Sequence, residues 1–191
     1  MDLTARSREK RPRETRTILV ADGAETIAFG FDDLVRYHGT RSICGLTVAF
    51  KVMEAAWEAL WSDAPPERDA IEVASGFPGP GTRDGFEMVT RAVTRGTYAV
   101  LPDARPGPLV AEAAKGAYLF RLSDGRRIVE LGLKPEIVPH QFVPMRRRLA
   151  RGEATEGEAR SFRALQFTFS DTLRALAPSD AVNVIDVRRV A

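Results

Sequence analysis

The residues best suited to chemistry lie in one short stretch, residues 37–46, which reads Tyr-His-Gly-Thr-Arg-Ser-Ile-Cys-Gly-Leu. It holds the only cysteine, Cys44, and one of the two histidines, His38. Thiolate and imidazole groups ligate transition metals and act as nucleophile and base. A polar loop here runs into a patterned helix, whose free N–H groups and dipole would lower a thiol pKa. The stretch predicts a metal- or substrate-binding loop; the alternative is a buried structural cysteine beside a loop histidine.

A glycine-rich loop at residues 75–82 is the second candidate site. The backbone amides of Gly79 and Gly81 could approach an anion at a helix start, where Thr82 and Arg83 would add a hydroxyl and a positive charge. The loop lacks the Gly-Lys-Ser/Thr ending of a Walker loop and the third glycine of a dinucleotide fingerprint. It therefore predicts either a site for a small anionic ligand or an ordinary turn.

The elements that must position these loops follow from apolar periodicity and turn residues. Helices are predicted at residues 31–37, 44–62, 84–93, 144–152 and 155–177, the last opening with the capping-box spacing Thr155-Glu156-Gly157-Glu158. Strands are predicted at residues 17–20, 70–74, 97–101, 117–122, 127–133 and 181–187. Strands and helices do not alternate regularly, which argues against a doubly wound sheet. We expect an α+β fold: a single domain whose mixed or antiparallel sheet is packed by a long central helix and a C-terminal helix.

The helix at 44–62 is apolar around more of its circumference than one packed face requires. Leu46, Phe50 and Met53 belong to one stripe, and Val48 and Val52 widen it. The extra apolar side should be covered by a hairpin or by a partner chain, and we expect a homodimer.

Length and composition limit the choice of class. With 191 residues, of which 44% are hydrophobic, the chain can build one substantial core. We assign that domain to residues 17–191 and expect residues 1–16, which are rich in arginine, to form a disordered basic arm. No apolar run is long enough to span a bilayer, no signal peptide is visible, and one cysteine cannot form an internal disulfide. These features predict a cytoplasmic protein with no membrane partner.

Nucleic-acid binding is not expected. The net charge is only +2, and no zinc finger, helix-turn-helix or aromatic RNA-binding motif is present. Arginines crowd residues 146–151, but consecutive positions spread around a helix, and Glu153, Glu156 and Glu158 follow closely. This cluster predicts a solvated face that neutralises itself.

Several motifs, taken in order, resemble the family of proteins similar to the E-type subunit of formylmethanofuran dehydrogenase, as found in stand-alone bacterial members. That family opens its long helix with His-Gly-His-x-Cys-Pro-Gly-Leu, which residues 37–39 and 45–46 match in part. Residues 69–76 resemble its next strand, residues 79–81 its glycine-rich turn, and residues 115–136 and 149–154 its hairpin and capped helix. The resemblance covers most of residues 27–187 and implies a small α+β domain.

The same resemblance implies a divalent metal such as zinc, held by His38 and Cys44. The departures weaken that site: Thr40 or Arg41 stands where the second histidine belongs, and Cys44 lies one place late. Gly76 or Phe77 replaces the later cysteine, the C-terminal zinc ribbon of the family is missing, and residues 82–108 look like an insertion. Two protein ligands are too few for a closed zinc site.

Three functions remain open. The first is a ligand- or metal-binding accessory protein, linked by resemblance to one-carbon or molybdenum/tungsten enzyme metabolism. The second is an enzyme that acts on a small anionic organic substrate through His38 and Cys44, with Arg41 or Arg83 gripping the anion. The third is a structural subunit of a larger complex. We expect His38 and Cys44 to share one cavity with the loop that contains Gly79.

Overall fold

The fold is built on a five-stranded mixed sheet. The computed structural model describes residues 16–190 of the chain. The strands run in the order β4-β3-β5-β6-β7. Their bounds are β3 Glu72–Ser75, β4 Tyr98–Val100, β5 Leu119–Ser123, β6 Arg127–Leu133 and β7 Val182–Arg189. Strand β4 is parallel to β3, and all other neighbours are antiparallel. The predicted basic arm lies outside the described residues except for Arg16.

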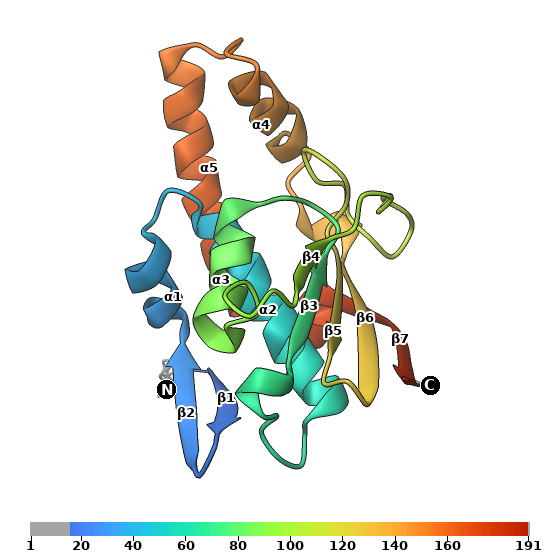
Figure 1. The fold of residues 1–191 in the computed structure, drawn as a ribbon. Helices are drawn as coiled ribbons and strands as arrows, with labels where there is room; N and C mark the ends of the chain where they lie inside the picture. Colours follow the sequence, from blue (N-terminus) through green and yellow to red (C-terminus); the bar gives the residue numbers. More distant parts are fainter. Residues whose placement is uncertain (1–15, 191) are drawn as a thin grey trace, which may run out of the picture.

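The remaining elements lie mainly on one side of the sheet and beyond its upper end (Figure 1). A separate hairpin precedes the helices. Its strands and the helices are β1 Thr17–Asp22, β2 Glu25–Gly30, α1 Phe31–His38, α2 Ile43–Leu60, α3 Pro80–Thr90, α4 Phe142–Ala150, α5 Glu156–Ala175 and the short α6 Pro178–Ala181. Helices α4 and α5 rise together past the end of the sheet and are joined there by a short loop.

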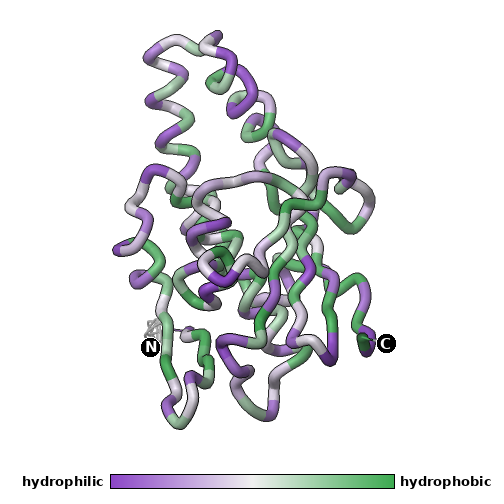
Figure 2. Tube along the Cα trace, viewed as in Figure 1, coloured by the Kyte–Doolittle hydropathy of each residue, from purple (hydrophilic) through white to green (hydrophobic). Residues whose placement is uncertain are grey.

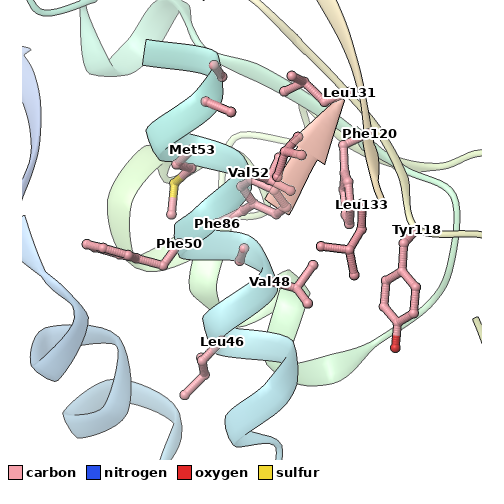
Figure 3. Close-up of a cluster of buried hydrophobic side chains, with 14 of the residues drawn as sticks. Leu46, Val48, Phe50, Val52, Met53, Phe86, Tyr118, Phe120, Leu131 and Leu133 are labelled. Carbon is pink, nitrogen blue, oxygen red and sulfur yellow. The ribbon is translucent and has the colours of Figure 1, made fainter. Parts of the chain in front are cut away.

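Helix α2 forms the centre of the core and packs between the sheet and the other helices. Figure 3 shows this cluster, which joins Leu46, Val48, Phe50, Val52 and Met53 of α2 to Phe86 of α3 and to Tyr118, Phe120, Leu131 and Leu133 of the sheet region. Figure 2 shows the same division, with apolar residues along the sheet and central helix and polar residues on the outer turns. Contacts from α1, α3, α5, β6 and β7 bury α2 on nearly every side. The apolar circumference of this helix is thus accounted for within one chain.

The predicted α+β fold is confirmed, and most elements fall within a few residues of their expected bounds. At the predicted Asp-Gly turn, Asp124 Oδ1 accepts from the backbone N–H groups of Arg126 and Arg127 at 2.9 and 2.7 Å. Gly125 follows Asp124 with a φ of 77°, a left-handed conformation that glycine adopts freely. The capping box is also present, because Thr155 accepts from the Glu158 amide while the Glu158 carboxylate returns to the Thr155 amide.

One predicted helix start was wrong, and one strand was missed. Helix α3 begins at Pro80 and not at Asp84, because proline is pre-organised for the first helical position. Strand β2 was not predicted, since Glu25–Gly30 contains few large apolar residues and depends on pairing with β1. None of the helices within residues 16–190 has the length and apolar character that crossing a bilayer would require.

Candidate functional site

His38 forms the centre of the candidate site. It is the last residue of α1, and its Nδ1 lies 2.7 Å from Oδ2 of Asp84 on α3. The other carboxylate oxygen of Asp84 accepts from Arg83 Nη1 at 3.1 Å. A carboxylate on Nδ1 orients the imidazole and, in the neutral ring, holds the proton on that nitrogen. Nε2 is then the ring nitrogen left to meet a ligand or accept a proton.

The His38 side chain, which is 12% exposed, lines an open surface pocket of about 620 Å³ between the loop after α1 and the α4–α5 pair, called the cavity below. The chain enters that loop through Gly39, whose φ of 80° needs a glycine. The cavity is lined by His38, Gly39, Thr40, Arg41, Leu149, Ala159, Phe162, Arg163 and Gln166. The lining therefore combines polar and positively charged side chains with an apolar group, Leu149, Ala159 and Phe162.

Arg163 of α5 fixes the polar part of the lining. Its guanidinium donates to the Thr40 carbonyl at 2.6 Å, to Thr40 Oγ1 at 2.9 Å and to the Arg41 carbonyl at 3.3 Å. The same group lies 4.6 Å from the ring centroid of Phe167, within cation–π range. Arg163 thus joins α5 to the loop after His38. As a result, two arginines, Arg41 and Arg163, lie at the same cavity.

Cys44 lies behind the cavity. It is only 5% exposed, and its Sγ donates to the Gln166 carbonyl at 3.1 Å. Burial raises the pKa of the thiol from 9.0 to about 12, and the nearby Arg163 charge offsets only part of that rise. The lowering expected from the helix start is outweighed by desolvation. Cys44 therefore stays protonated near neutral pH, and of the two predicted residues only His38 lines the cavity.

The glycine-rich loop has a packing role in the structure. A Cβ on Gly81 would lie 2.5 Å from the Ser42 carbonyl oxygen, and one on Gly45 would lie 2.9 Å from the Thr82 amide. Thr82 is fully buried, and its hydroxyl donates to the Gly45 carbonyl at 3.2 Å. These contacts let α2 and α3 approach closely. The cavity beside His38 is not lined by this loop, and an anion site at Gly79, Gly81, Thr82 and Arg83 stays a prediction.

The donor set does not fit a closed zinc site. Within residues 16–190, no three His, Cys, Asp or Glu side chains are grouped so that they could hold a metal ion. His38 Nδ1 is already engaged by Asp84, and the Cys44 thiol is protonated and bonded to a carbonyl. A structural zinc takes four ligands, and thiolate rather than thiol is the ligating form.

The arginine cluster on α4 is neutralised in part by the glutamates that the sequence indicated, Glu153 and Glu158, and in part by Glu112, which it did not indicate. Arg147 pairs with Glu112 at 2.6 Å, and Arg148 with Glu158 at 2.5 Å. Arg151 pairs with Glu153 just after the helix, also at 2.6 Å.

Three polar residues of the site were missed by the sequence reasoning, as was the apolar group formed by Leu149, Ala159 and Phe162. Asp84 had a local signal, since it is an acidic residue at a predicted helix start near a candidate loop. Arg163 and Gln166 had none, because they reach the site only through the packing of α5 against α2, more than a hundred residues further along the chain. No protein-family model matches the chain, and no curated protein matches it either.

Proposed function

We propose that the protein binds a small anionic organic molecule in the cavity beside His38. One observation carries this proposal: a His38–Asp84 pair and two arginines, Arg41 and Arg163, meet at a single cavity. Arginine recognises carboxylate and phosphate groups through its planar set of donors. The apolar group formed by Leu149, Ala159 and Phe162 would hold a hydrocarbon part of the ligand. A volume of about 620 Å³ lies within the range of small-molecule sites, roughly 300–1,000 Å³.

The role that we propose is that of a ligand-binding accessory protein in the cytoplasm. The resemblance to the formylmethanofuran dehydrogenase family supports a link to one-carbon or molybdenum/tungsten enzyme metabolism. A bound divalent metal is not part of the proposal, because the donor set that residues 16–190 place around His38 is incomplete. Homodimerisation stays a prediction. Helix α2 is already buried within one chain, so covering this helix is no longer a reason to expect a partner.

A second function, an enzyme that uses His38 as its general base, is favoured by the 2.7 Å bond between His38 and Asp84. A base held by a carboxylate on its far nitrogen is the arrangement that general acid–base catalysis uses. In this version Cys44 is not the nucleophile, since its thiol is buried and protonated. Asp84→Asn would then lower turnover more than ligand affinity, because the ring would lose its fixed tautomer.

The binding proposal can be tested by NMR titration of the ¹⁵N-labelled protein with small carboxylates and phosphate monoesters. We expect saturable shifts of the Gly39, Thr40 and Gln166 amides with at least one of these anions. A charge-assisted hydrogen bond contributes about 1.5–3 kcal/mol net, so Arg41→Ala should weaken binding roughly tenfold or more.

Arg126→Ala is the matched control, since Arg126 is an exposed arginine on the β5–β6 turn and not at the cavity. It should leave the affinity unchanged. Equal affinity for the neutral amide analogues, or shifts confined to residues outside the cavity, would contradict an anion site.

A further inference from the structure

Strand β7 is an unusually open sheet edge. It lies at the end of the strand order, and among residues 16–190 its only sheet partner is β6. Eight residues, Val182–Arg189, present that edge; they include neither lysine nor proline, and their charged members, Asp186, Arg188 and Arg189, gather in its C-terminal half. Proteins usually blunt an exposed edge with such residues or by keeping the strand short. The other edge of this sheet is short, because β4 has three residues.

The edge carries an apolar row. Val184 pairs with Leu131 and Val187 pairs with Val129, and a bulge at Ile185 brings both valines to the helix-covered face of the sheet. Leu131 and Val129 are fully buried, yet Val184 is 49% exposed and Val187 is 48% exposed. The core face therefore continues past β6 onto β7, the strand at the right-hand edge of the sheet in Figure 1, and ends there in these two half-exposed valines.

Charge differs between the two ends of β7. Arg189 lies directly opposite Arg127 of β6, and like charges placed opposite each other are destabilising. Exposed Asp180 lies just before the other end of the strand. An antiparallel neighbour identical to β7 would bring the end that Asp180 of α6 precedes toward each arginine end. The edge is thus complementary to itself.

We propose that β7 pairs with β7 of a second copy of this chain, so that two sheets join into one. The two-fold axis would pass between Ile185 and Asp186, which places Val184 of each copy opposite Val187 of the other. Arg189 would then lie opposite Val182 of the second copy, at the end of the strand that α6 and its Asp180 precede. The four valines would cover one another and extend the core across the interface.

This interface lies on a different surface from the cavity beside His38 and goes beyond the proposed binding function. It also differs from the dimer that the sequence suggested, which was to cover α2. The source of stability is the open backbone edge together with the valine row.

Light scattering tests whether a second copy of the chain pairs with the β7 edge. The wild-type protein, whose chain mass is 21.0 kDa, should have twice that mass at high micromolar concentration. The Val184→Lys/Val187→Lys variant should be a monomer, because edge lysines repel across the two-fold axis. Both valines are half-exposed, so this variant should keep the wild-type circular dichroism spectrum. The matched control is Val100→Lys on the other edge, where the valine is 44% exposed, and it should stay dimeric.

Disulfide trapping tests the register. In a Cys44→Ser background, Val184→Cys and Val187→Cys proteins are purified separately, mixed and oxidised. Opposed residues have Cβ atoms about 4.5–5.5 Å apart, near disulfide range. Identical residues would be three positions apart along the strand, roughly 10 Å. The mixture should therefore form covalent dimers at least several-fold faster than either protein alone.

A wild-type monomer would overturn the proposal and would leave the edge to a different protein or to another segment of the chain. A dimer that survives Val184→Lys/Val187→Lys, or equal trapping of mixed and unmixed cysteine variants, would overturn the β7 interface.

Discussion

The buried thiol of Cys44 gives a quantitative prediction about reactivity. Its pKa is raised from 9.0 to about 12, chiefly by burial. Because the pKa differs by about three units, the fraction of thiolate at pH 8 is about a thousandfold lower in the folded chain than in the unfolded chain. The thiolate is the reactive form. The 5% exposure of the residue restricts access by a reagent still further. Reaction of the native protein with iodoacetamide should thus be at least a thousandfold slower than reaction in denaturant.

The assay follows carbamidomethylation by intact-mass spectrometry at pH 8, with and without guanidinium. A Cys44→Ala/Tyr37→Cys variant is the matched control, because residue 37 is 53% exposed on the neighbouring helix. That cysteine should react at nearly the same rate in the native and unfolded chains. If Cys44 of the native protein reacts within tenfold of its unfolded rate, the thiol is neither buried nor protonated as described.

The same thiol should make stability depend on pH above neutrality. Between about pH 9 and pH 12 the unfolded thiol loses its proton while the folded one keeps it, so the unfolded chain binds fewer protons. The contribution of Cys44 is complete below pH 9 and falls by up to about 1.4 kcal/mol per pH unit as the pH rises. Comparison of wild-type and Cys44→Ala unfolding at pH 8 and pH 10 isolates this slope, and equal slopes would contradict it.

Two further predictions concern packing around α2. Lys51 and Glu54 form a buried ion pair at 2.5 Å. Glu54→Ala would leave the Lys51 charge buried, so it should lower the free energy of unfolding, measured by urea titration, by about 3–5 kcal/mol. A loss below about 1 kcal/mol would contradict a buried pair. Gly81→Ala would place a Cβ 2.5 Å from the Ser42 carbonyl oxygen and should cost about 1–3 kcal/mol, whereas Gly157→Ala, whose Cβ would meet nothing closer than 3.9 Å, should be neutral or stabilising. Similar melting temperatures for the two glycine variants would contradict the close approach of α2 and α3.

Much of the fold was predictable because its signals are local. The periodicity of residues 44–62, the Asp-Gly turn and the Thr155 capping box each depend on a few adjacent residues, and each is confirmed. Strand β2 and the early start of α3 were not predicted. The first depends on a partner strand and the second on a single proline.

The site was only half predictable. His38 and Arg41 could be chosen by residue type, and both line the cavity. The state of Cys44 could not be read from its place at a helix start, because burial under Gln166 outweighs the helix dipole. Arg163 gave no sequence signal, since its role depends on where α5 crosses the loop after α1. The glycine pattern at residues 79–81 has the composition of an anion loop, yet close helix packing requires the same residue type.

The cavity beside His38 should attract anions and present a reactive imidazole nitrogen to them. Alkylation with bromoacetate tests both properties directly, because this small carboxylate transfers its carboxymethyl group to an imidazole nitrogen and releases bromide. The chain has two histidines, and exposed His140 is the internal control. Bromoacetamide, which is similar in size and uncharged, is the reagent control. Peptide mass spectrometry gives the ratio of His38 to His140 labelling with each reagent.

We expect bromoacetate to label His38 on Nε2 in preference to His140, although the His38 side chain is only 12% exposed. The preference should fall by roughly tenfold or more with bromoacetamide and in Arg41→Ala, since a charge-assisted contact contributes about 1.5–3 kcal/mol. If His140 is labelled faster than His38 by both reagents, and the His38 rate is the same for the charged and the neutral one, the cavity is not an anion site.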